Sequence, residues 1–548
     1  MDTSLAEKSR LWFNRPVVIW LLKDFDLLSV LLRAVSLALE ALTLGGVVFL
    51  LLAALPTGVA ADTVRRLRAV TGWAALALAI TQLLAIATSS VILIGGSGFT
   101  FRDVCTTGFF FWGILLSASA LAIFLLMRAS SSRTLFASTP FALLVLLASV
   151  SMSHAAARLD HRWILLFLTV LHHIGSAAWI GAMPFLLIAL RREEGTPGGY
   201  VRRFSAMAVA SVSVLVLGGI GMAVFYVGSW QGVYGTTYGV MMLAKIYLLL
   251  VILGMGAGNF FLVRQIERAP APLLVRLRRF GEAEIGLGFT AILTAASLTS
   301  QPPAVDLVQN RLTAHEIVER MRWVKPRLTS PPVAALTPPS SIQVAVQRSV
   351  YGLGAEDDAN DLAWSEYNHH WAGLIVLAAG LLALLARSQR FRWAQHWPLL
   401  FIGLAVFIVL RADSESWPLG PRPFWASFSS PDVLQHRLYA LLITAFALFE
   451  WAVETGRLKS SVGSYVFPLL CAAGGALLLT HSHALRNIKD EMLAELSHTP
   501  IALLGATAGW SRWLELRLPG KRDSKIASYV WPVCLILVGV VLLDYRET

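Results

Sequence analysis

Two adjacent histidines, His172 and His173, lie within the apolar stretch "LHHIGSAAWIGAMPFLLIAL" (171–190). A polar side chain inside a membrane-spanning segment is unfavourable unless it has a partner or a function. Imidazole is a good ligand for copper, zinc, iron and nickel. The pair therefore indicates either metal handling or hydrogen bonds to neighbouring helices.

Helical spacing adds a soft ligand to this stretch. The spacing i, i+4, i+7 and i+11 predicts that four side chains share one helical face: His172, Ser176, Trp179 and Met183. The imidazole and the thioether would then lie about 16 Å apart along the helix axis. Thioethers select Cu(I) over zinc or magnesium, so this face suits a soft metal ion moving along it. Filling a gap in the packing is the alternative role for the methionine.

Membrane-spanning helices must position these residues. The chain has 548 residues, of which 56% are hydrophobic and 14% charged, whereas a soluble protein carries roughly 25% charged residues. Apolar segments of about 20 residues are long enough to cross a bilayer core of roughly 30 Å. We predict an all-α polytopic transmembrane helix bundle of about 14 helices, eight in the first half and six in the second. The predicted spans are 28–55, 71–95, 107–127, 138–157, 163–190, 203–228, 237–263, 280–299, 368–387, 396–412, 432–452, 463–482, 496–515 and 527–543.

The basic loops predict the orientation of these helices. Loops such as "RRLR" (65–68) and "RREEGTPGGYVRR" (191–203) alternate with basic-poor loops such as "VGSWQGVYGTTYG" (227–239). By the positive-inside rule the basic loops are cytoplasmic, so both termini face outward. The predicted domains are an outer N-terminal segment (1–27), an eight-helix membrane domain (28–299), an outer proline-rich loop domain (300–367) and a six-helix membrane domain (368–548). A solvated linker explains the loop domain at least as well as a binding domain does.

On this topology eleven of the twelve histidines lie on the outer side, which favours metal handling for the group. His154 stands two residues after Met152 near the outer surface, in "SMSHAAA" (151–157). An intramembrane lysine, Lys245, also needs a partner or access to water, and Glu40 is the counter-charge we consider for it. The candidate metal ligands of the first half are His154, His172, His173, Met152 and Met183.

A second group of outward-facing ligands lies in the six-helix half. The sequences "YNHHWAG" (367–373), "LQHRLYALL" (435–443) and "THSHALRNIKDEMLAELSH" (480–498) supply it. An H-x-H pair in an extended segment places both imidazoles on one side. We therefore consider a second metal site built from His369, His370, His436, His481, His483, Met492 and His498.

Several classes of protein are disfavoured by the sequence. The net charge of +12 comes mostly from the short loops between apolar runs, so we set nucleic-acid binding aside. The three cysteines are far apart and form neither a redox pair nor a disulfide framework. We find no phosphate-binding loop and no catalytic signature, and we expect no enzyme activity.

The first half, residues 28–303, resembles the copper resistance protein D (CopD) family of bacterial inner-membrane proteins. Six segments carry the resemblance in order: "GGVVFLLL", "SHAAA", "LHHIGSAAWIGAMPFLL", "RRFSAMAVASVSVLVLGGIG", "YGVMMLAKIYLLLVILG" and "AEIGLGFTAILTAASLTSQPPA". The residues that match are His154, His172, Trp179, Gly181 and Lys245, whereas His173 is additional. The six-helix second half departs from the minimal family pattern.

The resemblance implies movement of copper, as Cu(I) or Cu(II), across or into the bacterial cytoplasmic membrane, without an ATPase of its own. It also implies a separate periplasmic copper carrier, because the donor domain that some relatives contain is absent here. Two alternatives are kept open. One is a b-type haem protein for electron transfer, with His172 or His173 as an axial ligand. The other is an assembly or sensor protein that binds copper and does not translocate it.

Overall fold

The computed structural model describes residues 25–129, 131–193, 199–264, 271–332, 359–413, 416–428, 431–458, 462–480, 488–518 and 522–546. Every regular element within these ranges is a helix. Eleven of the described helices are long and apolar enough to cross a membrane. The prediction of an all-α polytopic membrane protein is therefore confirmed.

Each of the fourteen predicted spans overlaps a helix, including three that fall short of the criteria for a membrane span. Two of these three, α14 (Ala271–Leu298) and α23 (Ile488–Arg517), carry several charged residues. The third, α22 (Val466–Leu478), has only 13 residues. Length and charge, rather than a missing helix, thus separate these three from the others.

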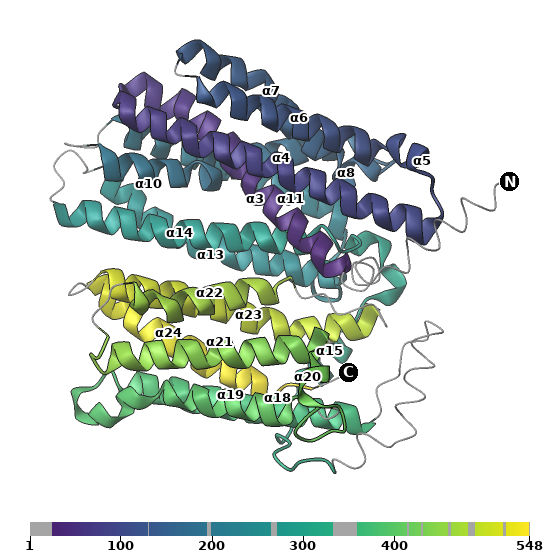
Figure 1. Ribbon diagram of the computed structural model, residues 1–548, viewed down its shortest axis with the longest axis vertical. Coiled ribbons are helices and arrows are strands. Elements are labelled where there is room, and N and C mark those ends of the chain that lie inside the picture. The colour runs from purple at the N-terminus through teal and green to yellow at the C-terminus, as the bar shows by residue number, and fades with distance from the viewer. Residues whose placement is uncertain are drawn as a thin grey trace. The chain divides into compact units, whose positions relative to one another are not determined.

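The chain forms two compact units (Figure 1). The first contains the described residues within 1–233, 241–308 and 480–482, and the second those within 234–240, 309–479 and 483–548. The boundary near residue 308 falls inside the predicted outer loop. Its later part, residues 333–358, lies outside the described residues, as does most of the predicted N-terminal segment 1–27.

In the first unit, α3 (Phe25–Phe49) is the helix around which the others pack. It contacts α4 (Ala61–Ser97), α7 (Ser132–Ser151) and α14. The other long helices of this unit are α6 (Gly108–Arg128), α9 (Arg162–Ser176), α10 (Met183–Arg192), α11 (Gly199–Val227) and α13 (Thr237–Val263). α6 packs against α4 and α7, while α9 packs against α11. Glu40 on α3 therefore lies at the centre of the unit.

The helix α4 begins ten residues earlier than the predicted span, because a basic segment that reads as a loop continues the helix. Arg68 is buried, at 5% exposure, and donates hydrogen bonds to the carbonyl oxygens of Leu126 (2.9 Å) and Ser131 (3.0 Å). These carbonyls belong to the end of α6 and the residues after it, where helical hydrogen bonding runs out. A cation at the C-terminal end of a helix also interacts favourably with the helix dipole.

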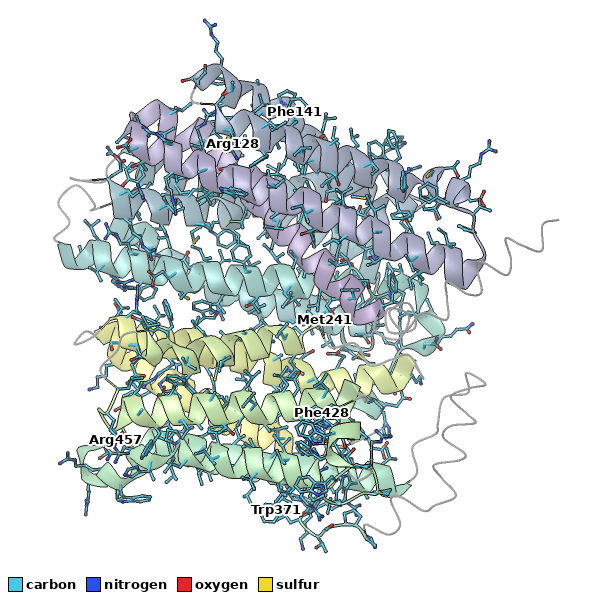
Figure 2. The ribbon with its side chains drawn as sticks, in the orientation of Figure 1. Arg128, Phe141, Met241, Trp371, Phe428 and Arg457 are labelled. Carbon is cyan, nitrogen blue, oxygen red and sulfur yellow. The ribbon has the colours of Figure 1, made fainter. Side chains whose placement is uncertain are left out.

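The second unit contains six long helices that form a closed ring of neighbours: α18 (Ala359–Leu385), α19 (Leu399–Arg411), α21 (Pro431–Glu454), α22, α23 and α24 (Arg522–Leu543). α18 packs against α19 and α24, α23 against α24 and α22, and α21 against α22 and α19. Trp397 and Trp531 are fully buried at its core, with ring centroids 5.2 Å apart. Figure 2 shows Trp371 and Phe428 toward one end of this unit and Arg457 at the other.

Candidate functional site

The histidine-bearing helix is interrupted by a π-helical turn. α9 ends at Ser176, the π turn η3 spans Ala177–Gly181, and α10 begins at Met183. Pro184 explains the interruption, because it has no N–H to donate to the carbonyl of Ile180 four residues earlier. The π turn also fits closely against α3, where a Cβ on Gly181 would overlap the carbonyl oxygen of Ala41.

This interruption corrects the assumption of one unbroken helical face. A π turn closes i→i+5 instead of i→i+4, so residues beyond it are displaced by about 100°, the angle of one residue. Met183 therefore does not continue the α-helical stripe that starts at His172. It lies buried at the start of α10, at 4% exposure. π turns occur frequently at functional sites.

A buried carboxylate, Glu40, connects three helices of the first unit. Nδ1 of His173 on α9 lies 2.9 Å from Oε1 of Glu40. Oγ of Ser149 on α7 donates to Oε2 of the same carboxylate at 2.6 Å. The side chain of Glu40 is 6% exposed and that of His173 17% exposed. Glu40 thus has His173 as its partner, rather than the Lys245 considered from the sequence.

Further polar side chains continue along α3 on either side of Glu40. Arg33, Ser36, Glu40 and Thr43 are spaced i, i+3, i+7 and i+10, which is one helical face. Arg33 is attracted electrostatically to Glu40. The hydroxyls of Ser36 and Thr43 are buried and have no hydrogen-bond partner among the described residues. Buried polar groups that lack a protein partner are commonly satisfied by water or an ion.

His172 points toward a different helix from His173. Its Nδ1 lies 3.1 Å from the carbonyl oxygen of Leu215 on α11. The glycines of α11 allow this approach, since a Cβ at Gly218 would lie 3.0 Å from the carbonyl oxygen of Leu168 and 3.3 Å from the backbone nitrogen of His172. Lys245 on α13 lies within electrostatic range of His172. The described carboxylates form no ion pair with Lys245, and Glu40 is engaged by His173.

His154 and Met152 lie where α7 ends. α7 stops at Ser151, and His154 begins the short helix α8 (His154–Ala157). Nε2 of His154 lies 2.8 Å from the carbonyl oxygen of Thr299, just after α14. Nε2 of Gln82 on α4 lies 3.7 Å from Sδ of Met152, close enough for a weak hydrogen bond.

The hydrogen bonds of these histidines determine which nitrogen of each ring can bind a metal ion. A carbonyl oxygen only accepts, so the bonded nitrogen must carry the proton: Nδ1 in His172 and Nε2 in His154. When the ring is neutral, the other nitrogen bears a lone pair, which is the form that binds a metal. His173 has the same arrangement toward Glu40, and a carboxylate or carbonyl behind the ring is typical of metal-binding histidines.

The described residues do not form a closed metal cage. Within the described ranges, no three His, Cys, Asp or Glu side chains come together so as to hold a metal ion. His154, His172 and His173 bond to different helices, α14's end, α11 and α3 respectively. The arrangement supplies separate ligands along the unit rather than one rigid coordination site.

Three of the candidate histidines in the second unit gather around Tyr545. His369 stacks on its ring at 3.8 Å, and His498 approaches the ring edge at 5.9 Å. Both ring nitrogens of His370 are bonded, Nε2 to the carbonyl oxygen of Tyr545 (2.8 Å) and Nδ1 to the backbone N–H of Arg327 (2.8 Å). His370 is therefore saturated by protein groups.

The other members of this group lie apart from Tyr545. His436 pairs with Asp413, with Nδ1 2.7 Å from Oδ1. Met492 is 1% exposed and packs with Val240 and Leu312. His481 and His483 lie outside the described residues. The second metal site stays a prediction.

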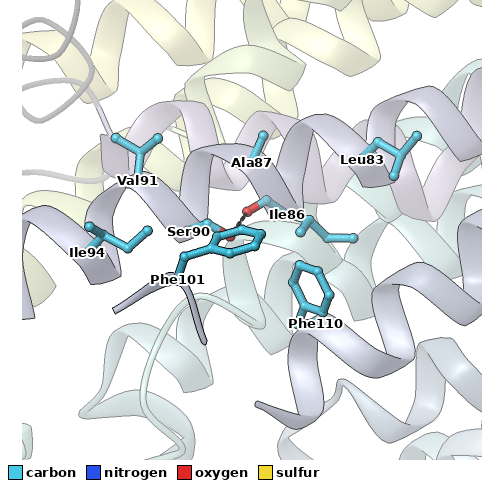
Figure 3. A pocket seen from close by; sticks show the side chains of 8 residues that line it. All are labelled: Leu83, Ile86, Ala87, Ser90, Val91, Ile94, Phe101 and Phe110. Carbon is cyan, nitrogen blue, oxygen red and sulfur yellow. Dashed lines mark hydrogen bonds between the residues drawn. The ribbon is translucent and has the colours of Figure 1, made fainter. Parts of the chain in front are cut away.

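One apolar cavity of about 310 Å³ lies among α4, α5 (Phe101–Cys105) and α6 (Figure 3). Leu83, Ile86 and Phe110 are among the side chains that line it. Ser90 supplies a hydroxyl, but that group is bonded to the carbonyl of Ile86 at 2.6 Å. An apolar lining of this kind suits a hydrocarbon chain and offers no metal ligand.

Glu40 and His173 were both candidate residues from the sequence, but the contact between them was not predicted. Arg33, Ser149 and Gln82 were not among the predicted site residues, although each is a polar residue in an otherwise apolar helix. That isolated polarity was the available signal. The spacing of residues along the chain does not predict which neighbouring helix each side chain contacts.

Comparison with known proteins finds a family match that lies mostly within the first unit. Residues 198–298 match the family model described as Copper resistance protein D (CopD). This region contains α11, with Leu215, and α13, with Lys245. The Copper transport protein CutJ of Bacillus subtilis (strain 168) is 29% identical over 163 residues, which cover 29% of each chain. The alignment thus spans less than a third of that protein. No solved structure matches this chain significantly.

Proposed function

Because residues 198–298 match the family model of the copper resistance protein D, we propose that this chain is a protein of the CopD family and moves copper ions across the bacterial cytoplasmic membrane. The similarity to a copper transport protein supports copper as the cargo. Eleven described helices that are long and apolar enough to cross a membrane support a role inside the bilayer. Copper homeostasis or resistance is the corresponding cellular role, and the protein uses no ATPase of its own.

The single observation that carries this proposal is the hydrogen bonding of three histidine rings. His154, His172 and His173 each direct one ring nitrogen to an oxygen acceptor. In a neutral ring the second nitrogen is then available to a metal ion. Hydrogen bonds to such acceptors also fix the orientation of each ring, which favours binding without further ordering.

In the proposed path copper passes between sparse ligands by exchange. His154 and Met152 receive the ion where α7 ends, and His172 and His173 bind it within the bundle. Met183, ten residues beyond His173 and on the other side of the π turn, supplies a thioether. Imidazole and thioether ligands together favour copper. A site with few ligands releases its ion readily, as transport requires.

The direction of the path rests on the charge of the loops. The positive-inside rule places both termini and His154 on the periplasmic side. A separate periplasmic copper carrier delivers the ion there by ligand exchange. Copper chelation in the cytoplasm, or the ion gradient, drives the transfer.

Purified protein in sealed vesicles with an internal copper probe tests translocation. We expect copper to enter vesicles that contain the wild type, and His172→Ala or His154→Ala to slow entry at least tenfold. His315→Ala is the matched control, because His315 is 86% exposed and pairs weakly with Glu319. Each variant must insert and run as a monodisperse species before its rate is compared.

Two outcomes contradict the proposed function, and a third contradicts the role of His172. Copper bound at the outer face without entry into wild-type vesicles would identify a binding or assembly protein instead. A Soret band in the visible spectrum of the purified protein, without bound copper, would identify a haem protein. Equal entry rates for wild type and His172→Ala would remove His172 from the path.

A further inference from the structure

An ion cluster is buried in the six-helix unit, apart from the proposed copper ligands. Three carboxylates belong to it, Glu450 and Glu454 on α21 and Glu515 on α23. Two guanidinium groups face them: Arg512 on α23, and Arg387, two residues beyond α18. Each side chain of the cluster is at most 14% exposed.

Arg512 lies at the centre of the cluster. Its Nη2 donates to Oε1 of Glu450 (2.6 Å) and to Oε1 of Glu454 (2.7 Å), and its Nη1 to Oε2 of Glu515 (2.7 Å). Arg387 donates to Oε1 of Glu454 (2.9 Å) and to Oε1 of Glu515 (2.6 Å). Trp531 of α24 adds a donor to Oε2 of Glu515 at 2.7 Å.

Glu450 differs from the other two carboxylates. It is completely buried, and its Oε2 has no hydrogen-bond partner among the described residues. Glu454 receives donors from both arginines, and both oxygens of Glu515 are bonded. A carboxylate oxygen that is buried without a donor is strongly unfavourable if it carries charge.

The charges of the cluster do not balance when every group is ionised. Three carboxylates face two guanidinium groups, which leaves one negative charge inside the unit. Among the described residues, the other titratable neighbour of Glu450 is the Cys471 thiol on α22, which interacts with it electrostatically and brings no positive charge. Uncompensated charge in a medium of low dielectric constant is avoided by neutralising a group.

We propose that Glu450 is a proton-binding site of the six-helix unit. The proton is taken from water and forms an O–H bond at Oε2, while Oε1 continues to accept from Arg512. No electron is transferred. With this proton the cluster is electrically neutral, and on release it becomes a buried anion that attracts another cation. Ionisable residues inside membrane segments mark proton or ion sites in many transporters.

Infrared absorption of the full-length protein in lipid nanodiscs at neutral pH tests the proposal. The carbonyl stretch of a protonated carboxyl group absorbs apart from the two bands of a carboxylate. We expect the difference spectrum between wild type and Glu450→Gln to contain a protonated carboxyl band and no carboxylate bands. Glutamine resembles a protonated glutamate in shape, so this variant should also keep the melting temperature of the wild type.

Two further variants make the result specific. Glu454→Gln removes one ionised carboxylate, so Glu450 should ionise and the protonated band should again be lost. This variant tests the charge balance even if Glu450→Gln fails to fold. The matched control is Glu366→Gln, whose carboxylate pairs with Arg327 at 3.2 Å and is 23% exposed. It should lose carboxylate absorption only.

Two results would overturn the proposal. If the difference spectrum between wild type and Glu450→Gln contains carboxylate bands and no protonated carboxyl band, Glu450 is ionised in the wild type. If the protonated band of the wild type appears in choline and disappears in sodium or potassium, a metal cation rather than the proton is the ligand.

Discussion

Nδ1 of His173 lies 2.9 Å from Oε1 of Glu40, and this contact connects α9 to α3 at the centre of the first unit. The same carboxylate accepts from Ser149 of α7 at 2.6 Å. A single buried carboxylate thus orients a histidine and joins three helices. Its removal should affect stability and metal binding together.

Glu40→Ala should lower both the melting temperature and the copper affinity. It leaves the N–H of His173 and the hydroxyl of Ser149 without their acceptor, which costs about 1–3 kcal/mol for each buried group. Loss of such a supporting partner typically reduces metal affinity by about 10–100-fold. Thermal unfolding and copper titration of the purified protein measure the two effects. Glu40→Gln keeps an acceptor oxygen, so its melting temperature and its copper affinity should fall less than those of Glu40→Ala. A copper affinity that is unchanged in Glu40→Ala would show that His173 binds no copper.

Gly181→Ala should prevent correct packing of the π turn against α3. A Cβ at this position would overlap the backbone oxygen of Ala41, and a backbone atom cannot move aside as a side chain can. Overpacking of this kind costs at least about 1–3 kcal/mol. Folded yield and melting temperature check the prediction. Gly254→Ala on α13 is the control, because a Cβ there meets nothing within 4 Å; equal losses in both variants would contradict the argument.

Arg512→Ala should strongly destabilise the second unit. Arg512 is 4% exposed and contacts three carboxylates, so its loss leaves buried negative charge uncompensated. Breaking a buried pair in this way costs about 3–5 kcal/mol. Denaturant unfolding followed by tryptophan fluorescence measures the change. Arg65→Ala removes an exposed pair with Asp62, at 79% and 82% exposure, and should leave stability unchanged.

Glu316, on the short helix α15 (Ala314–Arg320) outside the membrane spans, should make local stability depend on acid. The backbone N–H of Thr313, then the ammonium of Lys489 and the hydroxyl of Thr313, lower the pKa of Glu316 from 4.5 to about 2. Because the folded pKa lies below the unfolded value, this stabilisation is complete above pH 4.5 and is lost as the pH falls toward about 2.

The difference in melting temperature between wild type and Glu316→Gln measures this contribution. The difference should be present at neutral pH and shrink as the pH is lowered through the same interval. Glu319→Gln is the control on the same helix, since Glu319 is 71% exposed and lies 3.7 Å from His315. A difference that is constant from neutral pH down to about pH 2 would contradict the assignment.

The sequence by itself determined the class of the protein and the places of its helices. Apolar runs long enough to cross a bilayer are visible without any contact, because the membrane acts on composition and length. Fourteen such runs all overlap helices. The observed helix boundaries differ from the predicted ones where polar groups have hydrogen-bond partners. Arg68, for example, lies within α4 and donates to carbonyl oxygens at the end of α6.

The tertiary structure decided which polar groups meet. Helical periodicity indicates that His172 and His173 point about 100° apart, but only packing shows that one faces Leu215 and the other Glu40. Periodicity also failed beyond Ser176, because Pro184 and the close approach of α3 at Gly181 accompany a π turn. Spacing along a chain fixes relative angles on one regular helix. The neighbour that a side chain meets depends on how separate helices pack, and that information is carried by contacts between residues far apart in the sequence.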